Sequence, residues 1–193
     1  IVKSTAFFGR ISLYIRLDEL SISESNLFLE QQGFKRSVSE KFKLLSALGG
    51  VPWYLEQING KLSADENLKN LFFTKNSALS RAFDLIFHDL FGNRGEIYKK
   101  IIELLSSGPA DINKICEKLS YTKSGAMSKY LDNLIEASFL SRDFTWSIKS
   151  GEISRLSQFR LSDNYLRFYM KYVMRHEQRI LQGNFGDISM STL

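Results

Sequence analysis

Residues 97–135 read IYKKIIELLSSGPADINKICEKLSYTKSGAMSKYLDNLI, and their apolar spacing indicates how the C-terminal half of the chain folds. Apolar residues recur in it at helical spacing, in three segments separated by Gly108-Pro109 and by residues 120–124. The apolar positions are Ile97, Ile101, Leu104 and Leu105, then Ile112, Ile115, Cys116 and Leu119, then Met127, Tyr130, Leu131, Leu134 and Ile135. Three helices with a short turn between the last two form a helix-turn-helix.

A β-hairpin is expected directly after the third helix. Residues 139–146 are aromatic and β-prone, residues 149–152 are turn-like, and residues 156–161 can return as a second strand. A hairpin in this place is a wing. The sequence therefore predicts a winged helix-turn-helix over residues 92–162.

The first part of the chain is predicted to open with a strand and to continue as helices. Residues 11–17 alternate apolar and polar side chains with the period of a strand. The expected helices are 24–32 after Ser23, 39–48 with Phe42, Leu45 and Leu48 on its apolar face, one from Pro52 to Gly60, one from Ser63, and one from 78 to Gly92 with Leu79, Phe83, Ile86, Phe87 and Leu90. Gly33 and Gly49-Gly50 supply helix stops, and Ser63 with Glu66 forms a capping-box pattern.

A last amphipathic helix is expected from Asp163, which is a candidate N-cap. Its apolar positions are Tyr165, Phe168, Tyr169, Tyr172 and Val173. The tail from 183 to 193 has no period and is expected to fray. Taken together, these patterns predict a mainly α fold, a helical bundle followed by a winged helix-turn-helix with a small hairpin.

Composition limits the classes of protein that the chain can belong to. The 193 residues include 44% hydrophobic residues, 2 prolines and 1 cysteine, and the net charge is +5. The composition is globular, the longest uncharged stretch is too short for a bilayer span, and a lone cysteine forms no internal disulfide. We expect a cytoplasmic protein without a membrane partner. Because the chain begins at Ile1 without a visible secretory signal, we also expect it to be a piece of something longer.

Positive charge is concentrated near the C-terminus. Residues 155–179 hold Arg155, Arg160, Arg167, Lys171, Arg175 and Arg179 against Asp163 and Glu177. Such a basic segment is typical of contact with nucleic acid, an acidic protein face or a phosphate-bearing ligand, and equally of a solvated helix face.

A search for catalytic groups gives little. His88 and His176 lack neighbours at metal-ligand spacing, and Cys116 falls on an apolar helix face, as a buried hydrophobe would. Gly60-Lys61 does not form a phosphate-binding loop, because Leu62 follows it where Ser or Thr is needed. We therefore expect no catalytic residues in this chain and no ATP hydrolysis by it alone.

Several segments together resemble a known family. The segment 47–56, ALGGVPWYLE, resembles the Gly-Gly-Val/Ile-Pro-x-Tyr-Leu element of prokaryotic AAA+-related ATPases of the signal-transduction (STAND) class, the archaeal-type ATPases. Residues 8–10 with the strand 11–17 are similar to the end of the family's ATPase core, and residues 160–169, RLSDNYLRFY, to the element after its winged helix. The resemblance covers most of the chain.

The resemblance implies the lid and winged helix of such an ATPase, without its phosphate-binding loop. In the family the proline of the Gly-x-Pro element packs near adenine, so Gly50 and Pro52 are the implied nucleotide contacts, and Arg10 can approach from the core side. Trp53 stands where relatives often carry a basic residue. The alternative for Gly49-Gly50-Pro52 is an ordinary helix stop and restart, and for Arg10 a solvated side chain. The resemblance implies ATP or ADP with Mg in the longer protein, and no cofactor held tightly by this chain.

The winged helix has two alternative roles. Candidate DNA contacts on the third helix are Lys123, Ser124, Ser128, Lys129 and Asp132, and those on the wing are Lys149 and Arg155, with Arg142. The third helix is slightly acidic, because Lys129 opposes Asp132 and Glu136, which disfavours docking on phosphates. In the resembling class a winged helix commonly packs against protein and holds the nucleotide domain closed.

The sequence thus divides into 1–36 as the end of an ATPase core with a connecting helix, 37–91 as the lid, 92–162 as the winged helix, and 163–193 as a helix leading to a following region. The expected role is to relay nucleotide state in a signal-transduction ATPase. The alternative is a DNA-binding transcriptional regulator. The expected partners are the missing ATPase core, other protein domains and, in the alternative, DNA.

Overall fold

A computed structural model describes residues 15, 17–75, 77–92 and 95–185. In this part of the chain the fold is mainly helical, with a small two-stranded antiparallel sheet. The helices are α1 (Ile22–Gln31), α2 (Val38–Leu48), α3 (Pro52–Glu56), α4 (Ala64–Phe72), α5 (Ala78–Phe91), α6 (Gly95–Ser106), α7 (Ile112–Lys118), α8 (Gly125–Glu136), α9 (Asn164–Phe168), the π-helical η3 (Tyr169–Val173), the 3-10 turn η4 (Met174–His176) and α10 (Glu177–Leu181). The strands are β1 (Leu140–Trp146) and β2 (Ile153–Leu161).

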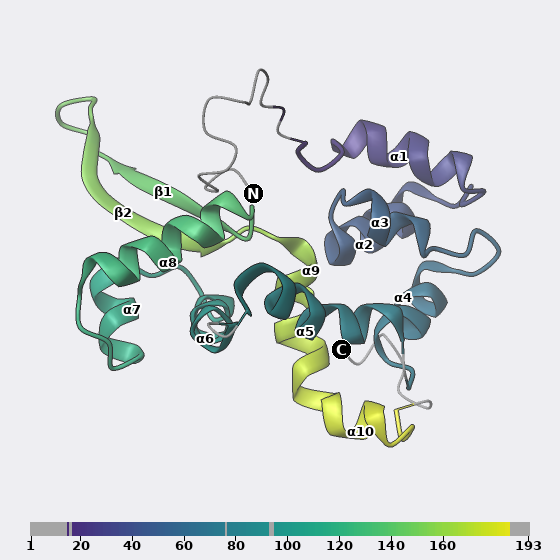
Figure 1. Cartoon of the computed structure of the whole chain (residues 1–193). Coiled ribbons are helices and arrows are strands. Elements are labelled where there is room, and N and C mark those ends of the chain that lie inside the picture. The colour runs from purple at the N-terminus through teal and green to yellow at the C-terminus, as the bar shows by residue number, and fades with distance from the viewer. Residues whose placement is uncertain (1–14, 16, 76, 93–94, 186–193) are drawn as a thin grey trace.

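The elements fall into two groups along the chain. Figure 1 shows α1–α4 on one side of the molecule and α7, α8 and the β1–β2 hairpin on the other, with α5, α6 and α9 between them. The hairpin projects from its group at one edge of the molecule. This arrangement matches the predicted order of a helical bundle, three helices and a hairpin.

Local capping signals fix where most helices begin. Ser63 and Glu66 form the predicted capping box at α4, and Asp163 caps α9 as predicted. Asp111 accepts from the backbone of residues 113 and 114 at the start of α7. At α1 the N-cap is Ser21 rather than Ser23, with a capping box to Glu24, because only Ser21 has an acidic residue three positions later.

Two predicted helix details in the N-terminal half are wrong. Phe42 was expected on the apolar face of α2 but is 64% exposed. Leu45 and Leu48 are buried as predicted, and Lys41 and Leu44 are buried with them. The helix from Pro52 ends at Glu56, before Gly60. Gly60 serves a close approach of two loops, because a Cβ there would lie 2.6 Å from the backbone of Gly33.

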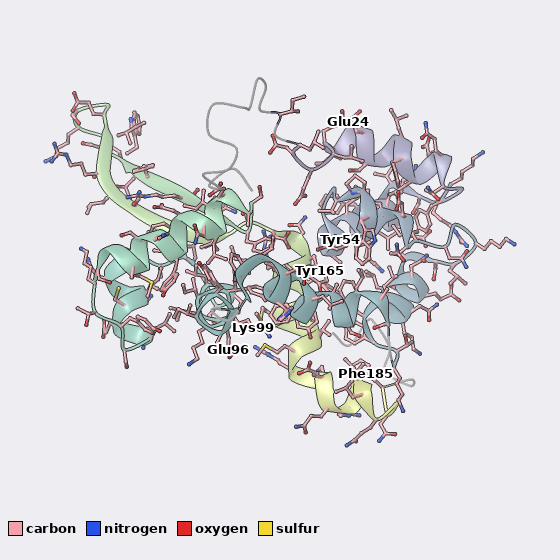
Figure 2. All side chains as sticks on the ribbon, in the orientation of Figure 1. Glu24, Tyr54, Glu96, Lys99, Tyr165 and Phe185 are labelled. Atoms are coloured by element: carbon pink, nitrogen blue, oxygen red, sulfur yellow. The ribbon has the colours of Figure 1, made fainter. Side chains whose placement is uncertain are left out.

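The core is rich in aromatic rings that join segments far apart in sequence. The rings of Tyr54 and Tyr165 are 4.8 Å apart, and Figure 2 shows these two side chains meeting in the interior. Tyr165 also donates its hydroxyl to the carbonyl of Leu79 at 2.7 Å. The core of α1–α5 is therefore completed by α9 from the other end of the chain.

The segment after Asp163 packs back on the N-terminal helices. Asn164 Nδ2 donates to the carbonyl of Leu45 at 3.1 Å, which ties the start of α9 to α2. Phe185 is 2% exposed and stacks on Phe73, with ring centroids 4.9 Å apart. The expected fraying from residue 183 is therefore wrong as far as Phe185, and residues 186–193 lie outside the described part.

The three helices α6–α8 and the hairpin agree with the predicted spacing. The strands pair in antiparallel register from Leu140 opposite Leu161 to Trp146 opposite Ile153, with an irregularity between Phe144 and Trp146. A further bridge joins Ala110, between α6 and α7, to Phe159 of β2 through two backbone hydrogen bonds of 3.1 and 2.8 Å.

Several other predictions can be compared with the fold. Cys116 is buried, as predicted. Leu90, expected on the apolar face of α5, is 56% exposed. The strand predicted at 11–17 lies mostly outside the described residues, although Ile15 and Leu17 belong to no strand. None of the helices in the described ranges is both long and apolar enough to cross a membrane.

Candidate functional site

Gly49 and Gly50 form a tight junction with the segment that precedes α1. The backbone N–H of Leu20 donates to the carbonyl of Gly50 at 2.9 Å, and the N–H of Gly50 donates to Glu19 Oε2 at 3.0 Å. A Cβ at position 50 would lie 2.1 Å from the carbonyl oxygen of Leu20. Packing alone therefore requires glycine at position 50, and contact of Gly50 with nucleotide stays a prediction.

Pro52 lies on the other side of this junction and is exposed at the first position of α3, as predicted for a helix restart. Beside it an apolar groove of about 440 Å³ opens between α3 and α5. Val51, Trp53, Tyr54, Ala82, Leu85, Ile86, Asp89 and Leu90 line this α3–α5 groove. Trp53, Leu85 and Leu90 are about half exposed, so the groove presents apolar surface to solvent next to Pro52.

Asp163, the N-cap of α9, also interacts electrostatically with Glu19, which no pattern in the sequence indicates. Burial, with a smaller contribution from the negative charge of Glu19, raises the pKa of Asp163 to about 6. The N–H of Leu166, which donates to the carboxylate at 2.6 Å, acts in the opposite direction. Burial, followed by the charges of Asp163 and Glu19, also raises the pKa of Tyr54. Asp163 is thus a buried carboxylate that interacts with the charge of Glu19, an exposed residue whose side chain accepts from the N–H of Gly50.

The candidate DNA contacts of α8 lie together on its exposed side. Lys123, Ser124, Ser128, Lys129 and Asp132 are all exposed, while Met127, Leu131 and Leu134 face the core. Ser124 is the N-cap of α8, but its side chain makes no capping hydrogen bond. The structure brings the predicted residues of this helix together without showing what they contact.

The exposed surface of the hairpin is more apolar than basic. Lys149 and Arg155 are exposed as expected, near the tip and on β2. Five large apolar side chains of the hairpin are also exposed: Phe144, Trp146, Ile148, Ile153 and Leu156. Arg142 lies over the rings of Phe144 and Phe159 and donates to Ser157, so its guanidinium is engaged within the sheet.

The basic segment 155–179 does not form a single surface. Arg160 pairs with Asp143 on β1 at 2.9 Å, and Arg179 lies over the ring of Phe185. Arg167 and Lys171 lie on α9 and η3. The concentration of charge seen in the sequence is thus divided among the hairpin, α9–η3 and the C-terminal turn.

The remaining candidates give no catalytic or metal site in the described residues. No group of three or more His, Cys, Asp or Glu side chains is placed to hold a metal ion there. His88 is exposed, and the ring of His176 lies 4.9 Å from that of Phe185. Arg10 lies outside the described residues.

Comparison with known proteins gives one informative similarity. The chain is 30% identical over 181 residues to a protein of Methanocaldococcus jannaschii that is described as uncharacterized. The match covers 92% of this chain and 38% of that relative, so the chain spans well under half of the length of the protein that it resembles. No protein-family model matches the sequence, and no solved structure matches it.

Proposed function

We propose that this chain is the regulatory part of a longer ATP-binding protein of the AAA+/STAND class. In this proposal α2–α5 form a lid over a nucleotide-binding core, α1 is the helix that connects the lid to this core, and α6–α8 with the hairpin form a winged helix that relays the nucleotide state. The longer protein binds ATP or ADP with Mg, and this chain alone turns over no ATP. The match to only 38% of a longer relative supports a role inside a larger protein.

The observation that carries the proposal is the surface around Pro52. A solvent-facing apolar groove of about 440 Å³ is costly to leave open, and such surfaces commonly mark contact sites. The groove adjoins the proline that the family resemblance places near adenine, and Pro52 itself is exposed. A nucleotide-binding core seated here would cover Trp53 and Leu85 and bring nucleotide close to Pro52.

The winged-helix assignment is supported by the bridge between Ala110 and Phe159. The bridge pairs the segment between the first two helices with the second strand, so that both strands of the hairpin are joined to the three helices, β1 through the chain after α8 and β2 through Phe159. A separate hairpin appended after α8 would not need this contact.

The exposed side chains of the hairpin favour contact with protein over contact with DNA. Phosphate binding relies on Lys and Arg, whereas exposed aromatic and aliphatic side chains are typical of protein interfaces. Trp146 is 62% exposed and Ile148 is 89% exposed. We therefore assign the hairpin to contact with another part of the longer protein or with a partner protein.

A nucleotide titration tests the proposal. In the longer protein, Pro52→Ala should weaken ATP or ADP affinity several-fold, because the apolar contact that the ring makes with adenine is lost at about 25 cal/mol per Å². Pro109→Ala is the matched control, since Pro109 is also exposed but lies between α6 and α7. Equal affinities in the two variants would remove Pro52 from the nucleotide site.

A DNA-binding regulator is the second candidate, favoured by the joint exposure of Lys123, Ser124, Ser128 and Lys129 on α8. If this candidate holds, Lys123→Glu with Lys129→Glu should weaken binding to a mixed-sequence duplex and reduce its salt dependence by about one unit of slope for each lost phosphate contact. Lys149→Glu with Arg155→Glu tests the wing in the same way. Absence of binding by the unmutated chain at low salt would eliminate this candidate.

A further inference from the structure

A second pocket lies on the face of α2 away from the Gly49-Gly50 junction. It has a volume of about 380 Å³ and is formed where α2, α4 and the α9–η3 segment meet. This volume is within the range of about 300–1,000 Å³ that is usual for small-molecule sites. Because three elements that are distant in sequence enclose it, the pocket exists only when α9–η3 is seated on α2 and α4.

The floor of this pocket is apolar and partly aromatic. Leu68 of α4 is buried, and Phe168 and Tyr172 are half-buried with ring centroids 5.1 Å apart. Phe168 is held in place by the ring of Phe72, whose centroid lies 4.7 Å away. The floor can therefore pack against a flat apolar group without rearrangement of the core.

The rim of the pocket is basic. Lys43, Arg167 and Lys171 lie on it, against the carboxylate of Asp65, which pairs with Lys43 at 2.8 Å. Arg167 donates from Nη2 to the carbonyls of Leu161 and Ser162, which fixes the guanidinium while its other N–H groups stay outside these two bonds. The Lys171 ammonium lies 5.0 Å from the centroid of the Tyr172 ring. The rim thus carries two positive charges in excess.

We propose that this pocket binds a small organic anion, with a planar apolar body against Phe168 and Tyr172 and a phosphate or carboxylate group between Arg167 and Lys171. Predominantly apolar lining with a few convergent charged groups is the usual composition of a ligand site. The proposal explains why part of the basic segment 155–179 gathers here. It is independent of the proposed nucleotide role, because this pocket and the α3–α5 groove share no lining residue.

Such a ligand would also fasten α9–η3 to α2 and α4. The ligand would touch α2 and α4 on one side and α9–η3 on the other. Because it binds only the folded chain, it raises the free energy of unfolding.

The experiment uses this chain and the fluorescent aromatic anion 8-anilinonaphthalene-1-sulfonate. We expect saturable binding that Lys171→Glu weakens about tenfold or more, because one charge-assisted contact becomes repulsive. Lys114→Glu on α7 is the matched control for net charge and should bind like the unmutated chain. Ser46→Glu, which brings a carboxylate to the same pocket from α2, should also weaken binding and serves if Lys171→Glu does not fold.

Competition separates the two kinds of anion. Displacement of the probe by AMP indicates an organic phosphate, and displacement by salicylate indicates an aromatic carboxylate; either result supports the proposal. Equal probe affinity in Ser46→Glu, Lys171→Glu and Lys114→Glu, or failure of both competitors, would overturn it.

Discussion

The junction around Gly50 and the β1–β2 hairpin differ in what they leave to solvent. At the junction, the backbone groups of Leu20 and Gly50 pair with each other, and the glycine has no room for a side chain. On the hairpin, Trp146 and Ile153 form a cross-strand pair that is mostly exposed on both sides. In the first region the sequence motif is needed for close packing of the fold. In the second region, large apolar side chains remain exposed and are not part of the core. A recognisable motif such as Gly49-Gly50 can therefore serve packing, and a segment without a motif, such as the hairpin, can provide a contact surface.

The largest effect is expected at Gly50. Gly50→Ala places a Cβ 2.1 Å from the carbonyl oxygen of Leu20, which is backbone and cannot turn away, so the free energy of unfolding should fall by about 3 kcal/mol or more. The control is Gly125→Ala, because a Cβ there meets nothing within 4 Å. Chemical denaturation of both variants measures the difference. Similar stabilities would mean that the junction is not closely packed.

The next effect concerns pH. The pKa of Asp163 is raised in the folded chain to about 6 from an ordinary value of 3.8, so the protonated form is the one that folding favours. Its contribution is complete below about pH 4 and is lost as the pH rises through 6, at a cost of about 3 kcal/mol. Asp163→Asn, which keeps an oxygen to accept from Leu166, should remove this loss. The measurement is the free energy of unfolding at pH 4 and at pH 7. An equal change between the two pH values in Asp163→Asn and in the unmutated chain would contradict this role of Asp163.

A smaller loss of stability is expected at Asn67, which is buried in α4, among the same N-terminal helices as Gly50. Its side chain accepts from the N–H of Asn59 and donates to the carbonyls of Asn59 and Ser63, holding the loop before α4. Asn67→Ala should lower the unfolding free energy by about 1.5 kcal/mol, because these buried groups lose their partner. Asn70→Ala, on the exposed side of the same helix, is the control and should change stability little.

The smallest effect on stability is expected on the hairpin. Trp146→Ser with Ile153→Ser removes exposed apolar area, so the unfolding free energy of this chain should change by about 0.5 kcal/mol or less. If the hairpin contacts another part of a longer protein, the same pair should weaken that contact. Analytical ultracentrifugation or pull-down of the separated parts measures it. A large loss of stability in the isolated chain would show instead that the hairpin side chains belong to its fold.

Local signals explain which parts of the fold the sequence could predict. The capping box of Ser63 and Glu66, the N-cap at Asp163 and the spacing of α6–α8 act within a few residues, and all were predicted correctly. Packing between distant segments left no such signal. Nothing near Asn164 in the sequence indicates its hydrogen bond to the carbonyl of Leu45, which lies 119 residues away.

For the candidate site, too, sequence patterns indicate only the features that do not depend on distant segments. Pro52 and the candidate side chains at α8 are exposed, and their contact with nucleotide or DNA stays a prediction. The steric need for glycine at position 50 and the burial of Asp163 beside Glu19 depend on the segment before α1, whose position only the folded chain shows. The aromatic stripe of α5 indicated core at Phe87 but not the exposure of Leu90, because helix periodicity does not say where neighbouring helices end.

Amide hydrogen exchange of the α3–α5 groove measures directly whether a nucleotide-binding core covers it. We expect peptides covering residues 51–56 and 85–91 to exchange more slowly in the longer protein than in this chain, and more slowly again when ATP is added, because the nucleotide-binding core covers Trp53 and Leu85. Peptides from α7, which the proposed lid contact leaves uncovered, should exchange alike in both. Identical exchange of the groove peptides in this chain and in the longer protein, with and without ATP, would contradict the account.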